Sequence, residues 1–193
     1  MCIRDRKKMA ENVTKVTKDI LPDQKLDCVA YGCTSGTIAS GYKSIYEKIN
    51  IAKPNTKVTT PITSAINAFK TLKINKLSIF TPYTNEINQS LINYFKNKNI
   101  AIDELFYLDI ASDLDIGKVD PNYLFDVLTK KNLSQSNVLF ISCTALPVLS
   151  ILQDLENKLG KVILSSNQTL IWDTLRQIKY KSKIKGFGEL FKN

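Results

Sequence analysis

The stretch Tyr31-Gly32-Cys33-Thr34-Ser35-Gly36 decides how this sequence folds. An apolar run of β-forming residues, 26–31, ends at a glycine, and a helical pattern over residues 37–49 follows. Strand, tight turn and helix in this order place Cys33 at the carboxyl end of a strand and the N-terminus of a helix. Free backbone N–H groups converge there, so the turn suits an anion and favours ionisation of the thiol.

The same arrangement occurs a second time further along the chain. An apolar strand over residues 136–142 ends in Cys143-Thr144, and a helical stretch over residues 146–159 follows. Each unit then continues with a second strand, near residues 57–60 or 161–164, and with a helix opened by hydroxyl residues. This internal repeat predicts two similar α/β halves, each presenting one cysteine.

The composition narrows the class of protein. The 193 residues suffice for a buried core, no apolar run has the length of a membrane span, and no secretory signal is visible. We therefore expect a soluble cytoplasmic protein without a membrane partner. The four cysteines are too sparse for a disulfide framework and contain no C-x-x-C pair, which argues against zinc.

Two further features of the composition bear on chemistry. The sequence has no histidine, which excludes Ser-His-Asp, Cys-His and His-metal sites, so acid–base work falls to Cys, Asp, Glu, Lys or Tyr. The net charge of +9 raises the question of nucleic acid. The lysines are spread along the chain, with the richest cluster at residues 180–185, and we interpret them as solvated surface without a nucleic-acid partner. A modest alternative is that they steer anionic substrates.

The order of elements indicates two unequal domains. Residues 1–8 have no periodicity and resemble a translated sequencing-adapter remnant, so we set them aside as non-native. The first domain then covers residues 9–73 together with a C-terminal helix within 168–193, and the second covers residues 74–167. Because the second half has an extra strand, helix and strand before its cysteine unit, we expect the first domain to lack its first strand and to expose an edge.

Individual elements follow from hydrophobic spacing. We expect helices over residues 9–21, 64–72 and 85–97, a strand ending in Thr81-Pro82-Tyr83, another over 101–108, and a polar loop over 109–121. Cys28 lies inside a strand and is interpreted as a small buried hydrophobe. Alternating strands and helices predict parallel sheets covered on both faces, with ligands at the carboxyl ends of the strands. Cys33, Tyr83, Cys143 and Ser165 all follow such ends.

Four motifs in order resemble the aspartate/glutamate racemase superfamily, within it the branch of maleate isomerases, arylmalonate decarboxylases and ectoine-utilisation proteins. They are Tyr31-Gly32-Cys33-Thr34-Ser35-Gly36-Thr37, Thr81-Pro82-Tyr83 with Asn88, Ser142-Cys143-Thr144, and Ser165-Ser166-Asn167-Gln168 followed by Trp172 and Leu175-Arg176. The resemblance extends from about residue 9 to the end. It implies two pseudo-symmetric flavodoxin-like parallel-sheet domains, an active site in the cleft between them, and neither cofactor nor metal.

The resemblance also implies the site residues. Cys33 and Cys143 would face each other across the substrate as catalytic thiols, and the substrate would be bound by Thr34, Ser35, Gly36, Tyr83, Asn88 and Thr144. Decarboxylases of this branch carry glycine at the position of Cys33, which favours racemase or isomerase. The first strand, which supplies an asparagine or serine ligand in the family, is absent. Leu114 stands about where maleate isomerases carry asparagine, so the ectoine-utilisation relatives remain an alternative.

Two thiols on opposite faces of a small carboxylate support two reactions. One thiolate can remove a proton while the other thiol delivers one to the opposite face, which racemises the centre, with the growing charge held by oriented donors. Alternatively, Cys33 can add to a double bond, with rotation and elimination giving the other geometric isomer and Cys143 as acid.

We therefore expect a cofactor-independent isomerase or racemase of a small dicarboxylate or amino acid, in a homo-oligomer, a dimer or a tetramer. A decarboxylase using Cys143 alone, an inactive fragment and a small-anion binder are alternatives. We interpret Asp113 and Asp115 as loop-capping or solvated carboxylates.

Overall fold

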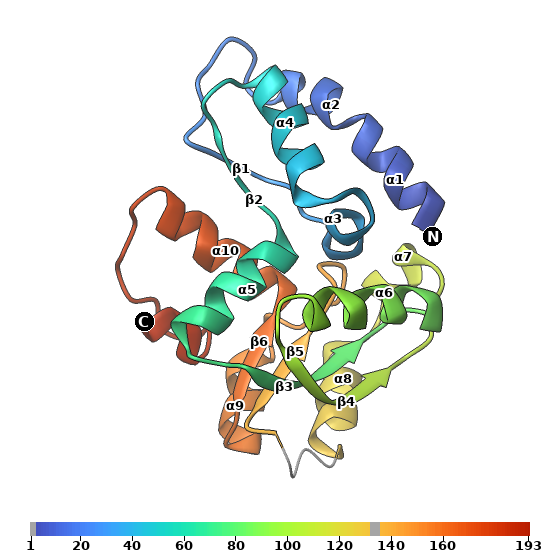
Figure 1. Cartoon of the computed structure of the whole chain (residues 1–193). Coiled ribbons are helices and arrows are strands. Elements are labelled where there is room, and N and C mark those ends of the chain that lie inside the picture. Colours follow the sequence, from blue (N-terminus) through green and yellow to red (C-terminus); the bar gives the residue numbers. More distant parts are fainter. Residues whose placement is uncertain (1–2, 132–135) are drawn as a thin grey trace.

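Two parallel sheets of unequal size organise the chain (Figure 1). The computed structural model describes residues 3–131 and 136–193, so Met1 and Cys2 of the segment set aside lie outside the described residues. The strands are β1 (Cys28–Ala30), β2 (Lys57–Thr59), β3 (Lys76–Thr81), β4 (Ala101–Tyr107), β5 (Val138–Ile141) and β6 (Val162–Ser165). The smaller sheet pairs β1 with β2, and the larger has the order β4-β3-β5-β6, with neighbouring strands parallel. The α/β class with parallel sheets is thus as predicted.

The helices connect successive strands and cover the sheets. They are α1 (Ile3–Glu11), α2 (Val13–Asp19), α3 (Thr34–Ser40), α4 (Tyr42–Ala52), α5 (Pro61–Thr71), α6 (Asn85–Lys96), α7 (Asp113–Gly117), α8 (Pro121–Thr129), α9 (Leu152–Leu159) and α10 (Ser166–Gln177), followed by a short 3₁₀ turn, Glu189–Lys192. Pro121 opens α8, where its missing N–H costs nothing. Within the described ranges, none of the helices is long and apolar enough to cross a membrane.

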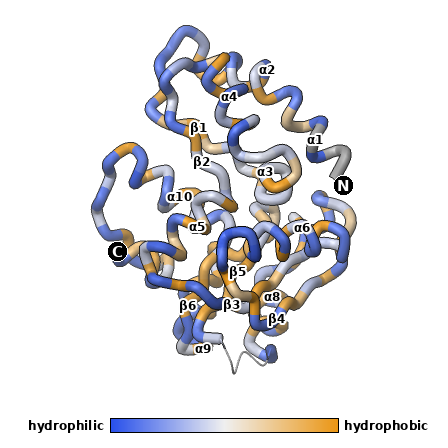
Figure 2. Tube along the Cα trace, in the orientation of Figure 1, coloured by the Kyte–Doolittle hydropathy of each residue, from blue (hydrophilic) through white to orange (hydrophobic). Residues whose placement is uncertain are grey.

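The larger sheet carries the main core. Its central strand β5 is buried at every position, as expected for a parallel strand covered on both faces. Phe69 of α5 and Phe95 of α6 each meet Phe140 of β5 edge-on, with ring centroids 5.5 and 5.8 Å apart. Hydrophobic residues gather around this sheet in Figure 2. Tyr83 and Cys143 therefore lie just after strands that are firmly packed in the main core.

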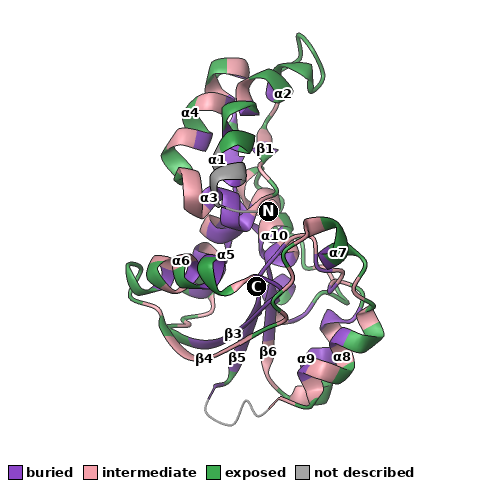
Figure 3. Ribbon diagram, turned by 90° about the vertical axis from the view of Figure 1, so that its right-hand side faces the viewer, coloured by how far each residue is buried: buried purple, intermediate pink, exposed green. Residues whose placement is uncertain are grey.

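A smaller core lies beneath the smaller sheet. Val29 of β1 and Val58 of β2 pack with Val13 of α2 and with Ile45 and Ile49 of α4. Fewer apolar side chains are buried here than in the main core, and Figure 3 shows much of α2 and α4 exposed. Within residues 3–131 and 136–193, β1 pairs with β2 alone.

Helix α10 ties the two sheets together. It packs against α5 and against both strands of the smaller sheet, and it follows directly from β6 of the larger sheet. The buried Asp173 accepts hydrogen bonds from Ser64 Oγ at 2.8 Å and from Asn67 Nδ2 at 3.1 Å, and the hydroxyls of Thr174 and Thr59 lie 2.7 Å apart. The predicted domain boundaries, including the absence of a first strand, stay a prediction.

Two predicted helices differ from the structure because glycine and proline interrupt them. The helix expected over residues 37–49 is divided into α3 and α4 at Gly41, whose φ of +78° lies outside the helical region. The helix expected from residue 146 begins only with α9. Pro147 disfavours the helical conformation at Leu146, so an irregular turn precedes that helix.

Two polar segments are more ordered than the sequence predicted. The expected loop over residues 109–121 contains α7, because the Ser112 hydroxyl accepts the N–H of Asp115 and caps a short helix. The helix expected over residues 9–21 is divided into α1 and α2, and α1 already begins at Ile3 and packs against α3. Part of the segment set aside therefore belongs to the folded chain.

Candidate active site

The first cysteine lies at the N-terminus of a helix, as predicted. Cys33 is the N-cap of α3, and its Sγ accepts the backbone N–H of Gly36 at 3.2 Å. A Cβ atom at position 36 would lie 2.8 Å from Sγ of Cys33 and 2.8 Å from the hydroxyl of Tyr31, so only glycine leaves room for this approach. A thiolate formed here is therefore met by a backbone donor at the positive end of a helix.

The second cysteine lies in a strained turn after β5. The φ angle of Cys143 is +117°, which a residue with a side chain rarely adopts and which costs on the order of 1–3 kcal/mol. Burial raises the pKa of the Cys143 thiol, and the N–H groups of Ala145 and Leu146 and the Tyr83 hydroxyl oppose this rise. The thiol is therefore protonated near neutral pH and able to act as an acid.

Tyr83 lies within electrostatic reach of both cysteines. Its pKa is well above the usual value, because the ring is buried and because Cys143 and Cys33 are both close enough to disfavour a second negative charge. Its hydroxyl consequently stays protonated and can donate to an anion. The structure therefore brings Tyr83 near both Cys33 and Cys143, and all three were predicted to belong to the site.

Asn88 was predicted to bind substrate, but the structure gives its amide other partners. Asn88 is fully buried, its Oδ1 accepts the Thr81 hydroxyl at 2.7 Å, and its Nδ2 donates to the carbonyl of Tyr83 at 3.1 Å. Both ends of the amide are thus used inside the turn that carries Tyr83. The residue therefore supports the turn that carries Tyr83, and its role in substrate binding stays a prediction.

Hydrogen bonds join the two cysteine turns directly. Ser166 Oγ accepts both the Thr34 hydroxyl and the N–H of Cys143, each at 3.0 Å. The Thr144 hydroxyl donates to the carbonyl of Gly32 at 2.7 Å. Thr34 and Thr144, both predicted to bind a carboxylate, therefore already donate their hydroxyl protons within the protein.

The joining residues were not assigned a role from the sequence. Asn167 Nδ2 adds a hydrogen bond to the carbonyl of Thr144 at 3.0 Å, beside the two bonds of Ser166. Both residues belong to the motif quoted at residues 165–168. The signal that could have identified them is their place after β6, at the same edge of the sheet as Cys143.

Arg6 reaches the site from α1. Its guanidinium lies 3.8 Å from Sγ of Cys33, 3.4 Å from Oδ1 of Asp113 and 5.9 Å from the centre of the Tyr83 ring. Sequence reasoning missed this residue because it lies in the segment set aside. Beside it, Ser35 lines a hollow of about 60 Å³.

The two acidic residues of α7 differ in their surroundings. Asp113 is partly buried by its ion pair with Arg6, and Asp115 pairs at the surface with Lys118 at 3.1 Å. Hydrogen bonding to Lys118 and to Ser112 lowers the pKa of Asp115, which stays ionised. In the described part of the chain, no group of three or more His, Cys, Asp or Glu side chains is placed to hold a metal ion.

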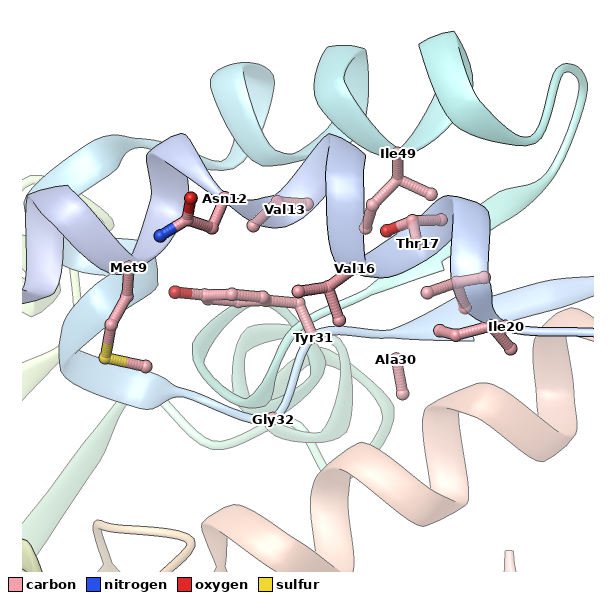
Figure 4. Close-up of a pocket in the computed structure, with 11 residues that line it drawn as sticks. Met9, Asn12, Val13, Val16, Thr17, Ile20, Ala30, Tyr31, Gly32 and Ile49 are labelled. Carbon is pink, nitrogen blue, oxygen red and sulfur yellow. The ribbon is translucent and has the colours of Figure 1, made fainter.

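An apolar groove adjoins the site on the side of the smaller sheet (Figure 4). It has a volume of about 360 Å³, lies between the two N-terminal helices and β1, and includes Val13, Val16 and Ile20 in its lining. Its lining reaches Tyr31 and Gly32 but neither cysteine. Burial raises the pKa of Tyr31 to about 12, and its hydroxyl has no hydrogen-bond partner among the described residues. The groove and the polar site are therefore chemically distinct.

Comparison with known proteins agrees with this fold. The family model of arylmalonate decarboxylase matches residues 20–191. The chain is 26% identical to a maleate isomerase of Geobacillus stearothermophilus over 95% of its length and 76% of that protein's. Its structure superposes on maleate isomerase Iso of Pseudomonas putida S16 with a TM-score of 0.92, at 17% identity, covering 100% of this chain and 81% of the other.

A third comparison concerns a trapped intermediate. A mutant of the maleate cis-trans isomerase of Nocardia farcinica, solved with a covalently bound succinylcysteine intermediate, superposes with a TM-score of 0.89 at 16% identity. The alignment covers 98% of this chain and 80% of that one. At such identities the solved structures support the architecture of two parallel sheets.

Proposed function

Because the chain belongs to the arylmalonate decarboxylase family of the aspartate/glutamate racemase superfamily, we propose that it is a cofactor-independent cis–trans isomerase of a small unsaturated dicarboxylate, with maleate as the first candidate. The observation that carries this proposal is the approach of the two cysteine turns around the buried Tyr83, where Ser166 Oγ accepts the Thr34 hydroxyl and the Cys143 N–H, each at 3.0 Å, and the ring lies within electrostatic reach of both thiols. Two thiols around one buried donor suit a two-sided reaction on a small anion.

In the proposed reaction the two cysteines have different roles. The Cys33 thiolate adds to one alkene carbon, and the electron pair of the double bond moves to the neighbouring carbon, which takes the proton of the Cys143 thiol. The product is a thioether with a single carbon–carbon bond that rotates freely. The Cys143 thiolate then removes the proton, the carbon–sulfur bond breaks, and the trans alkene leaves with Cys33 restored as thiolate.

The electrostatics of the two thiols support this division. Cys33 is partly exposed, and its Sγ accepts the N–H of Gly36 at 3.2 Å, so the sulfur is accessible for addition and faces a backbone donor at the N-terminus of α3. Cys143 is buried with a raised pKa, so it begins as the proton donor. The protonated Tyr83 hydroxyl and the Ser35 hydroxyl are the candidates to hold negative charge as it builds on a substrate carboxylate.

Proton NMR tests the proposal. The purified chain is incubated in heavy water with maleate, aspartate, glutamate and a malonate-type acid, and we expect conversion of maleate to fumarate. Cys33→Ser is expected to abolish conversion, and Cys143→Ser to slow it by about 10²–10⁴-fold, the usual contribution of a general acid. Cys28→Ser is the matched control, because Cys28 belongs to β1, where its Sγ lies 3.9 Å from Thr59 Oγ1. Full turnover in both site variants would refute the two-thiol mechanism.

A decarboxylase is the second candidate, because the family model is that of arylmalonate decarboxylase. In that reaction Cys143 alone would protonate the carbanion left after loss of carbon dioxide. Cys33→Gly should then preserve or increase activity, measured as release of carbon dioxide from the malonate-type acid. The cytoplasmic location, the homo-oligomer and the ectoine-utilisation role stay predictions.

A further inference from the structure

One buried hydroxyl accepts hydrogen bonds from both reacting turns, which the bond from Thr144 to Gly32 also joins. Ser166, the first residue of α10, is fully buried, and its Oγ accepts the Thr34 hydroxyl and the N–H of Cys143, each at 3.0 Å. A hydroxyl oxygen has two acceptor sites, so both are used. We propose that Ser166 is a positioning residue, which fixes the orientation of the Cys143 thiol relative to the Cys33 turn. This inference rests on the proposed function in so far as both thiols react.

The Cys143 turn needs such a support because its backbone is strained. A residue with φ near +117° persists only where surrounding contacts hold it. Its N–H is held by Ser166, and the carbonyl of Thr144, the next residue, is held by Asn167 Nδ2 at 3.0 Å. The first two residues of α10 therefore hydrogen-bond to the turn at two successive residues, Cys143 and Thr144. These bonds hold the sulfur close to the groups that oppose the rise in its pKa, which are the N–H groups of Ala145 and Leu146 and the Tyr83 hydroxyl.

Ser166 is free for this task because a neighbour caps the helix. The Ser165 hydroxyl accepts the N–H of Gln168 at 3.1 Å, and Gln168 Oε1 accepts the N–H of Ser165 at 3.2 Å, which completes a capping box. Removal of the Ser166 hydroxyl consequently leaves the cap intact. It breaks only the link between the Thr34 turn and the Cys143 turn, so a variant without that hydroxyl should fold.

The link also explains the burial of Thr34. This residue is 2% exposed, and its hydroxyl is directed at Ser166, which comes from 132 positions further along the chain. Thr34 is the next residue after Cys33 in the chain, and Ser166 Oγ accepts the N–H of Cys143. The path Cys33, Thr34, Ser166, Cys143 therefore contains two hydrogen bonds and no solvent-exposed member apart from Cys33. A short buried path of this kind transmits a fixed geometry between the thiols.

The test compares Ser166→Ala with Thr174→Val. Thr174 lies on the same helix and donates its hydroxyl to Leu170 O at 2.8 Å, away from both cysteines, so its loss controls for removal of one hydroxyl from α10. Thr34→Val removes the other half of the link, and Thr34→Ser retains the hydroxyl. For Ser166→Ala and Thr34→Val we expect kcat on maleate to fall by about 10–100-fold, as for a misplaced reacting group, with KM changed less than about threefold. Thr34→Ser should restore most of kcat.

Alkylation supplies a readout that needs no substrate. In a Cys2→Ser, Cys28→Ser background, the rate of iodoacetamide labelling at each remaining cysteine is followed by mass spectrometry between pH 6 and 11. Ser166→Ala is expected to move the profile of Cys143 to higher pH, because a released turn loses its sulfur donors, and to leave that of Cys33 in place. If the parent chain converts none of the acids, the proposed function fails while this shift still supports the positioning role. Parental kcat and an unchanged Cys143 profile in Ser166→Ala would overturn the inference.

Discussion

The close approach at Gly36 makes the sharpest prediction, because one added methyl group meets a reacting atom. In Gly36→Ala the new Cβ would lie 2.8 Å from Sγ of Cys33 and 2.8 Å from the Tyr31 hydroxyl, with Cβ of Cys33 at 3.2 Å. The two closest atoms, Sγ of Cys33 and the Tyr31 hydroxyl oxygen, are the ends of side chains. These side chains can therefore move while the backbone of α3 stays in place. We therefore expect Gly36→Ala to fold and to displace the sulfur.

The displacement follows from the contact distances. The sulfur must withdraw by about 0.6 Å to reach an ordinary contact of 3.4 Å. A turn of about 30° away from its rotamer costs about 0.5–1.5 kcal/mol, which lowers Tm by only about 1–6 °C in a chain of this size. Turnover is more sensitive, because a misplacement of about 1 Å can cost about 100-fold. We expect kcat to fall by about 10–100-fold.

The assay is conversion of maleate to fumarate by proton NMR, together with a thermal melt. Gly117→Ala is the matched control, because it also adds a methyl group within a helix, and the added Cβ meets only the carbonyl of Ala145, at 3.9 Å, among the described residues beyond its own helix. The control should keep parental turnover. If Gly36→Ala turned over as fast as Gly117→Ala, the close approach would have no bearing on reactivity, and the position of Cys33 would not be set by this glycine.

Two more predictions concern charge. Arg6→Ala should lower turnover by more than about fivefold, because its buried guanidinium lies 3.8 Å from Sγ of Cys33 and 3.4 Å from Oδ1 of Asp113, and its removal leaves both groups without their cation; parental turnover in this variant would show that Arg6 does not support the site. For Cys143, the raised pKa keeps the proposed acid protonated to higher pH, so kcat should hold until above about pH 8.5 and then decline. The same shift means that the folded state binds this proton more tightly than the unfolded state, so its stabilisation is present below about pH 8.5 and is lost as the pH rises through the folded value. A melt series in which Cys143→Ala lost stability at high pH as steeply as the parent would contradict this.

Local sequence patterns predicted the elements that carry the site. The apolar runs before Cys33 and Cys143 are strands, and both cysteines follow strand ends, because strand periodicity and glycine turns act over a few residues. The helix boundaries failed where single residues decide them. Gly41 divides one predicted helix, and Pro147 removes the first turns of another.

Contacts between distant residues could not be predicted in the same way. The bond from Thr34 to Ser166 joins positions 132 apart, and that from Thr144 to Gly32 joins positions 112 apart. No local spacing encodes such pairs, because they arise only when two sheets are placed against each other by α10. The hydrogen bonds of Asn88 inside the Tyr83 turn were not predicted either, and its role in substrate binding stays a prediction. Its partners are near in sequence, but its complete burial is a property of the folded core.

The repeat predicts two equivalent cysteines, and the structure makes them different. Cys33 caps a helix that starts immediately after it, so its sulfur receives a backbone N–H at 3.2 Å. After Cys143 the chain forms an irregular turn that contains Pro147, and the sulfur is buried close to Tyr83. One repeat unit thus yields a partly exposed thiol at a helix end and a buried thiol that holds its proton. A reaction that needs a nucleophile on one side and an acid on the other requires this inequality.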